Sequence, residues 1–187
     1  MKNLAEWFSE YGESHKNKIN KLIHWICIPL IFWSIIALFS LIPHSFMDIF
    51  INSLANDLMH WGTILIFIGL IFYLKHSLNI FLGMLFFSLL VLIDIYYTVH
   101  FFDLHKYWGV FDSFKISGEK FLLIISVIIF IFAWILQFIG HQIEGAKPSF
   151  LKDIQFLLIG PAWLLGFLYK KIGIKFLNAI NKIGFLK

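Results

Sequence analysis

Residues 120–140 read KFLLIISVIIFIFAWILQFIG, and this stretch decides the fold class. Its one charged residue, Lys120, stands at the start, and the residues that follow are apolar except for Ser126 and Gln137. An α-helix needs about 20 predominantly apolar residues to cross the hydrocarbon core of a bilayer. The stretch therefore predicts a membrane-spanning helix.

The composition extends this conclusion to the whole chain. Of its 187 residues, 60% are hydrophobic and 14% are charged, and the mean hydropathy is +0.84. A chain of this size cannot hide so much apolar surface from water, because small domains keep much of their surface exposed. A spanning backbone must be a helix or part of a closed barrel. Since the apolar runs are far longer than the roughly 10-residue strands of a barrel, we expect an all-α integral membrane bundle.

The other apolar runs predict the number of crossings. We expect four transmembrane helices, at about 22–42, 61–74, 78–100 and 120–140, in a single domain that covers residues 1–187. The last run, 154–169, is interrupted by Gly160-Pro161, and we expect it to be either re-entrant or a fifth span. Amphipathic helices are expected at both ends, over residues 3–15 and over the Lys-rich tail 170–187.

The charged residues indicate where the chain resides. All 15 of its Lys and Arg residues are Lys, and they lie near the ends of apolar runs, where they can meet lipid headgroups. The absence of Arg argues against a nucleic-acid partner, and the lone Cys27 can form no internal disulfide. Lys residues before the first span, and none in the connector 43–60, favour a cytoplasmic N-terminus. A chain rich in Lys, Ile and Phe is typical of an AT-rich genome, so we expect a multi-pass protein of a bacterial cytoplasmic membrane.

Eight His residues in so apolar a chain raise the question of a metal site. Those near span ends or in loops, where an amphipathic imidazole is at home, are His44, His60, His76, His100 and His105. His15, His24 and His141 differ, because each lies among other polar groups. Imidazole ligands, with or without a carboxylate, suit Fe(II), Zn or Cu better than Mg or Ca.

Polar neighbours indicate how such a site would be supported. Asn20 precedes His24 by one helical turn and can hydrogen-bond the second ring nitrogen, as partners of metal-bound His do. Gln137 and Glu144 share a helical stripe with His141 at a span end, and polar groups at such depth are usually functional.

The spacing of the first two His residues adds a geometric condition. His15 and His24 would face opposite sides of an unbroken helix, because nine residues at 100° each amount to half a turn beyond two full ones. If both bind one ion, the chain must turn between them, and Lys16–Lys18 is the natural place.

Other interpretations remain open at this point. Asp94 lies deep in an apolar run and either belongs to a site or pairs with a polar group on another helix. Polar clusters also form interhelical hydrogen-bond networks, so the alternative is a non-enzymatic membrane protein whose His, Asn, Gln and Glu clusters are structural. The HxxxH and HxxHH boxes of di-iron hydroxylases and desaturases do not occur, and no repeat supports a transporter.

Two blocks of the sequence resemble the Mpo1-like family. The first is Tyr11-x3-His15-x4-Asn20-x3-His24-x4-Pro29-Leu30, and the second is Trp134-Ile135-Leu136-Gln137-Phe138-Ile139-Gly140-His141 with Glu144-Gly145 and Pro148. Gly160-Pro161 also fits, so the resemblance extends from about residue 4 to about residue 170. Lys18 and Cys27 stand where many relatives carry Pro and Gly, but no candidate ligand is lost.

The resemblance implies an Fe(II)-dependent dioxygenase that uses O₂ to shorten 2-hydroxy fatty acids by one carbon, an α-oxidation step. The resemblance also implies that, in eukaryotic relatives, this reaction serves the degradation of phytosphingosine at the endoplasmic reticulum. Carried over by position, the candidate iron ligands are His15, His24 and His141, with Glu144 as a further ligand or a group behind the ligands. The expected supporting or substrate-contacting residues are Tyr11, Asn20, Asp94 and Gln137, and His100 is a candidate fourth ligand.

Overall fold

The computed structural model describes residues 3–43, 59–107, 116–145, 147 and 155–173, with side chains of α5 described up to Phe101. Within them the chain forms helices α1 (Leu4–Glu13), α2 (Lys18–Ser40), α4 (Trp61–His76), α5 (Leu78–Tyr107), α6 (Gly118–Glu144) and α7 (Phe156–Lys171). The described residues contain no strand, which confirms the all-α class. Most of the tail 170–187, where an amphipathic helix is expected, lies outside the described residues.

Side-chain caps determine where several helices begin and end. Asn3 and Glu6 form a reciprocal capping box at the start of α1, with two hydrogen bonds of 2.9 Å. The side chain of Asn17 caps α2. Helix α6 ends at Gly145, whose φ of 72° favours glycine. The chain therefore turns between α1 and α2, where the sequence predicted a turn.

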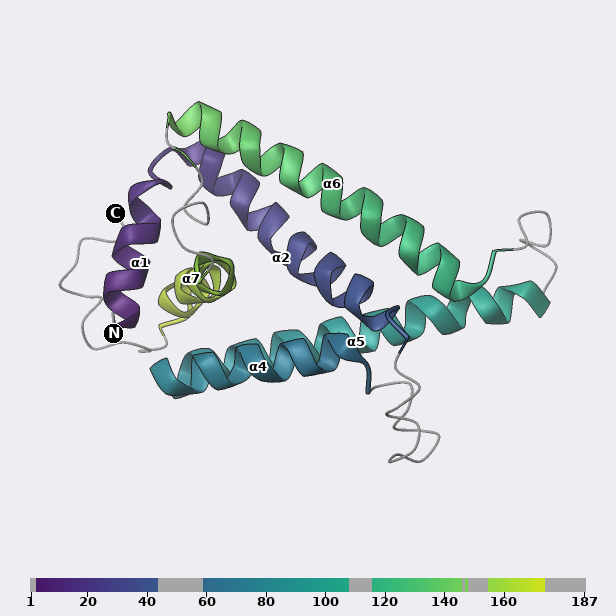
Figure 1. Cartoon of the computed structure of the whole chain (residues 1–187). Helices are drawn as coiled ribbons and strands as arrows, with labels where there is room; N and C mark the ends of the chain where they lie inside the picture. Colours follow the sequence, from purple (N-terminus) through teal and green to yellow (C-terminus); the bar gives the residue numbers. More distant parts are fainter. Residues whose placement is uncertain (1–2, 44–58, 108–115, 146, 148–154, 174–187) are drawn as a thin grey trace.

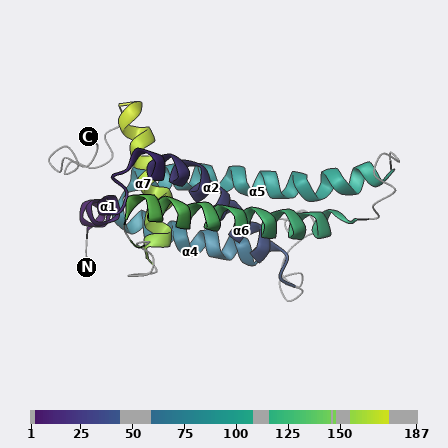
Figure 2. The ribbon, with the colours of Figure 1, turned by 90° about the horizontal axis from the view of Figure 1, so that it is seen from above.

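The helices of the bundle run in two main directions. In Figures 1 and 2, α2, α4, α5 and α6 run lengthwise through the molecule, whereas α1 and α7 lie across one end of it. Among the described helices, α2 and α6 make the most extensive contact. Small residues at this contact, Cys27 on α2 with Ala133 and Gly140 on α6, let the two backbones approach closely.

Three helical segments are long and apolar enough to cross a membrane, namely Lys18–Ser40, Leu78–Phe101 and Gly118–Glu144. Helix α4 is apolar but has 16 residues, about 24 Å at 1.5 Å per residue, against a hydrocarbon core of about 30 Å. Three of the four expected spans are thus matched by helices of spanning length, and the remaining one by a shorter helix. Helix α7, the expected re-entrant or fifth span, runs across the others (Figure 2).

The two faces of α6 differ in polarity and exposure. Its outer face exposes a row of large apolar side chains, including Ile128, Ile131 and Phe132, each more than half exposed. A soluble monomer rarely carries so continuous an apolar surface. The opposite face buries Gln137 and His141 against the other helices, so the polar residues singled out from the sequence point into the bundle.

Helices α1 and α7 close one end of the bundle by packing on each other. The ring of Tyr11 on α1 lies 5.3 Å from the ring of Trp163 on α7, in an edge-on arrangement. Helix α7 is also tied to α4, because the hydroxyl of Tyr73 donates a hydrogen bond to the carbonyl of Leu158 (2.8 Å). This crosswise pair lies where α2 begins and α6 ends (Figure 1).

Candidate metal centre

Three His residues from three separate segments meet at the closed end of the bundle. His15 follows α1, His24 lies in the second turn of α2, and His141 lies in the last turn of α6. One ring nitrogen of each lies within 4.8 Å of the others, and the ring centroids are 4.3, 4.9 and 5.1 Å apart. All three side chains are at most 5% exposed. The structure thus brings together the three candidate ligands predicted from the sequence.

Backbone carbonyls orient two of these rings. The Nδ1 atom of His15 donates to the carbonyl of Tyr11 (2.6 Å), and that of His24 donates to the carbonyl of Asn20 (2.9 Å). A carbonyl only accepts, so both rings carry their proton on Nδ1 and present Nε2 with its lone pair. Metal-bound imidazoles are commonly held in this way. The sequence predicted a hydrogen bond between the side chain of Asn20 and this ring, whereas in the structure the backbone carbonyl of Asn20 makes the contact.

Two nitrogens of the cluster lack a hydrogen-bond partner within the described residues: Nε2 of His15 and Nδ1 of His141. Buried polar atoms left unpaired cost free energy, so native structures rarely leave them without a partner or ligand. Burial lowers the pKa of His15 from 6.5 to about 4, outweighing the opposite effect of its hydrogen bond to Tyr11. The ring is therefore neutral near pH 7, as a metal ligand must be. Three such imidazoles fit Fe(II), Zn, Cu or Ni.

Glu144 fastens the α1–α2 turn to the end of α6. Its carboxylate accepts hydrogen bonds from the backbone N–H groups of Lys16 and Asn17 (both 2.8 Å) and from Nδ2 of Asn20 (3.0 Å). It is outside the group of side chains that could share an ion. From the sequence, Glu144 could be either a ligand or a group behind the ligands. Its contacts in the structure are those expected of a group behind the ligands.

Close packing between α2 and α6 holds this network together. Asn20 is fully buried, and its Nδ2 also donates to the carbonyl of Ser14 (3.0 Å). A Cβ atom at Gly140 would lie 2.5 Å from Oδ1 of Asn20. Glycine is therefore needed next to His141, because any side chain there would displace Asn20.

Aromatic rings enclose the cluster on the side of α1 and α7. Tyr11 stacks on His15 at 4.1 Å, and Trp163 lies 5.5 Å from the same ring. Burial raises the pKa of Tyr11, so its phenol stays protonated. Trp163 was not anticipated from the sequence, although it follows Gly160-Pro161 by two residues.

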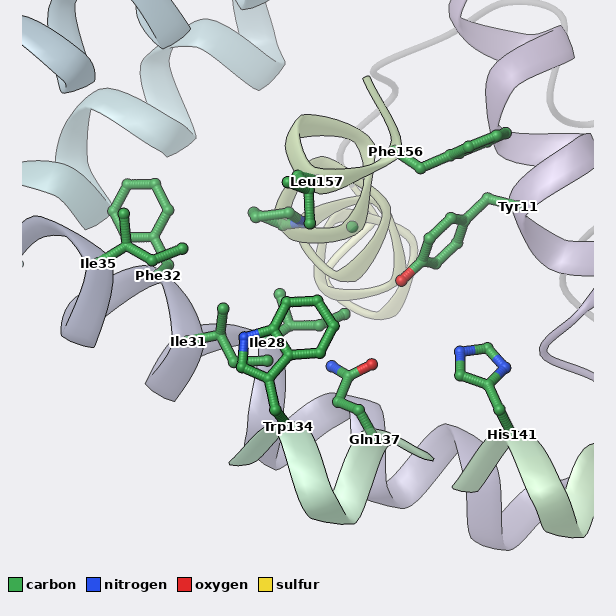
Figure 3. A pocket seen from close by; sticks show the side chains of 12 residues that line it. Tyr11, Ile28, Ile31, Phe32, Ile35, Trp134, Gln137, His141, Phe156 and Leu157 are labelled. Carbon is green, nitrogen blue, oxygen red and sulfur yellow. The ribbon is translucent and has the colours of Figure 1, made fainter. Parts of the chain in front are cut away.

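A cavity of about 80 Å³ adjoins the cluster and lies between α2, α6 and α7. Figure 3 shows side chains from these helices and from α1 around it, with His141, Gln137 and Trp134 successive along α6. Its lining consists of Tyr11, Ile28, Ile31, Phe32, Ile35, Trp134, Gln137, His141, Phe156, Leu157, Gly160 and Pro161. The cavity gives a ligand room beside the three His residues.

Two of the residues singled out from the sequence lie elsewhere. Asp94 on α5 accepts a hydrogen bond from Nε1 of Trp33 (2.7 Å); this Trp stands nine residues beyond His24, about 13 Å along α2. His100 stacks on Tyr96 at 4.0 Å and donates to its carbonyl. Both side chains therefore have interhelical or local partners, and neither belongs to the cluster.

The other described His residues have local roles. His60 caps α4 by accepting a hydrogen bond from the backbone of Thr63 (3.2 Å), and His76 donates to the carbonyl of Phe72 (2.8 Å). His44 lies outside the described residues, and the side chain of His105 is not described.

The fold and the cluster define a class: an all-helical protein with helices long and apolar enough to span a membrane, and with a buried cluster of three His residues at one end of its bundle. The sequence profile of the family described as 2-hydroxy-palmitic acid dioxygenase Mpo1-like matches residues 1–172. The chain belongs to this Mpo1-like family, as its two blocks indicated. No curated protein and no solved structure matches the chain.

Proposed function

We propose that the protein is an Fe(II)-dependent dioxygenase that shortens 2-hydroxy fatty acids by one carbon. The observation that carries the proposal is the buried cluster of His15, His24 and His141, in which Nε2 of His15 and Nδ1 of His141 lack a hydrogen-bond partner among the described residues. The family description, which names a 2-hydroxy-palmitic acid dioxygenase, supports the reaction class.

The reaction balances without a further reductant. One 2-hydroxy acid and one O₂ yield the carboxylic acid one carbon shorter, one CO₂ and one H₂O. Bound Fe(II) would supply coordination positions for O₂ and for the hydroxyl and carboxylate oxygens of the acid. The three His residues would hold the ion, and the carbonyls of Tyr11 and Asn20 fix two of the rings.

The position of the cluster suits a substrate that is a lipid. The end of the bundle that holds the cluster contains the α1–α2 turn, the start of α2 and the ends of α4 and α7 (Figure 1), and the sequence has Lys residues in each of these segments. They are Lys16, Lys18, Lys21, Lys75, Lys170 and Lys171. Lys favours the headgroup level and the cytoplasmic side of a membrane. We therefore place the centre at the cytoplasmic surface, where an acyl chain remains in lipid while its carboxylate reaches the ion.

Metal content tests the centre directly. The protein, purified in detergent and loaded with Fe(II) without oxygen, should hold about one Fe per chain by elemental analysis. His24→Ala and His141→Ala should each lose it, because each removes a ligand. His76→Ala is the matched control and should keep it, since the ring of His76 contacts the carbonyl and the ring of Phe72 and lies outside the three-His cluster. A folded wild type that holds no metal would refute the centre.

Oxygen uptake and product mass test the reaction. The loaded wild type should consume O₂ with a 2-hydroxy fatty acid and release the acid one carbon shorter, and should be inactive with the same acid lacking the hydroxyl. Equal turnover of both acids, or turnover without Fe(II), would contradict the proposed chemistry.

A further inference from the structure

The cavity beside the cluster has a polar end and an apolar end. Tyr11, Gln137 and His141 line the end next to the three His residues (Figure 3). Away from them the lining becomes apolar, with Ile31 and Ile35 among its side chains. A ligand that matches both ends must itself be polar at one end and apolar at the other.

Gln137 is the polar group that lacks a partner here. Its side chain is 9% exposed, and it makes no hydrogen bond within the part of the chain that the structure describes. Its amide atoms are not among the fully enclosed unpartnered atoms of the described residues, so they border open space in which a ligand can supply their hydrogen bonds. Figure 3 shows its amide directed into the cavity, one helical turn from His141. An amide offers two N–H donors and one carbonyl acceptor, which match the carboxylate and hydroxyl of a 2-hydroxy acid.

The apolar lining follows the direction of the bundle. Ile28, Ile31, Phe32 and Ile35 recur at the spacing of one helix face and extend for about 10 Å along α2. On α6, Trp134, Gln137 and His141 line the facing side over a similar length. Both helices run lengthwise (Figures 1 and 2), so a chain in this cleft would lie parallel to the surrounding lipid tails.

We infer that this cleft binds the substrate, with Gln137 on its 2-hydroxy-carboxylate head and the first part of its acyl chain between Ile31, Ile35 and Trp134. The inference rests on the proposed function, because it assigns the substrate's place at that centre. Ile35 and Trp134 are only half-buried, so the cleft reaches the surface that faces lipid. The rest of a long chain continues into the bilayer.

In this arrangement, the head and the acyl chain of the substrate have different roles in binding. Moving methylenes from lipid into an apolar cleft gains little, since lipid tails are as apolar as Leu. The affinity for the substrate must then come from contacts with its 2-hydroxy-carboxylate head. The shape of the cleft determines which acyl chains are excluded. Removing the Gln137 amide should weaken every chain length alike. Filling the cleft at Ile31, which is 8% exposed, should exclude long chains and spare acids too short to reach it.

Kinetics with a series of acids tests this division. Gln137→Leu should lower kcat/KM about tenfold for short and long 2-hydroxy acids, with wild-type metal content and thermal stability. Gln142→Leu, on the exposed side of the same helix end, is its control and should be unaffected. Ile31→Trp should lose long-chain acids and keep 2-hydroxybutyrate, whereas Ile131→Trp on the lipid-facing side should resemble wild type. Equal loss of short and long acids in Ile31→Trp, or no effect of Gln137→Leu, would overturn the inference.

A labelling experiment separates this inference from the proposed reaction, because it needs no turnover. A 2-hydroxy fatty acid with a diazirine in its chain is photolysed with the full-length protein in lipid nanodiscs, and crosslinks are mapped by mass spectrometry. We expect labelling at Ile31–Ile35 and Trp134 that excess unlabelled acid suppresses and that Ile31→Trp diminishes. Labelling confined to outer residues such as Ile131 would overturn the cleft assignment even if the enzyme turns over. The expected labelling in a protein that turns over no 2-hydroxy acid would uphold the cleft and refute the proposed reaction.

Discussion

Replacing Glu144 by Gln tests whether the α1–α2 turn must be fastened to α6 for the centre to form. Glu144→Gln preserves shape but exchanges one carboxylate oxygen for an NH₂ group that faces an N–H donor of Lys16, Asn17 or Asn20. At least one hydrogen bond to a charged acceptor is lost, which is worth about 1.5–3 kcal/mol. That corresponds to roughly a 10- to 100-fold change in the equilibrium holding the turn in place.

Because His15 lies in this turn, the loss should appear in metal affinity. We expect Glu144→Gln to bind Fe(II) about 10 to 100 times more weakly in an anaerobic competition titration against a chelating dye. Glu13→Gln, an exposed carboxylate at the end of α1, is the control and should match wild type. If folded Glu144→Gln binds Fe(II) as tightly as wild type, the fastening role assigned to Glu144 is wrong.

Three further predictions follow from contacts described above. Gly140→Ala should cost about 1–3 kcal/mol in unfolding free energy and lower metal content, because its Cβ would displace Asn20. Gly69→Ala, where the nearest atom would be 3.7 Å away, should do neither. Tyr73→Phe should lower stability by about 1 kcal/mol in denaturant or thermal unfolding, since it removes the hydrogen bond to Leu158; equal stability would show that this bond does not hold α7. Chelation should lower the unfolding midpoint of iron-loaded wild type, because an ion that binds only the folded state stabilises it. The same treatment of His24→Ala should have no effect.

Periodicity and local polarity predicted much of the centre. His15 and His24 stand half a helical turn out of phase, so a shared ion demanded the turn that the structure has between α1 and α2. His141 was marked by Gln137 and Glu144 on the same stripe of an otherwise apolar helix. Helical spacing fixes which side chains share a face, so the sequence alone could single out the three His residues that the structure brings close together.

The remaining features depend on contacts between distant segments, which spacing along one helix does not encode. The sequence placed Asn20 beside His24, yet its side chain bonds Glu144, more than a hundred residues away. The crosswise direction of α7, and with it the position of Trp163 against His15, arises from packing on α1, α2 and α5 and from the hydrogen bond to Tyr73 on α4. Asp94 drew attention as a carboxylate in an apolar run, but its partner Trp33 lies on another helix.

The division of the centre between the first helices and α6 has a consequence for biosynthesis. When α1 and α2 have left the ribosome and entered the membrane, the chain carries His15 and His24 but not the residue that completes the set. Under the proposed function, metal capture would wait until α6 has docked on α2. A chain that stops before Gly118 should therefore reach the membrane without an ion, and iron loading in the cell would report that translation and assembly of the bundle are complete.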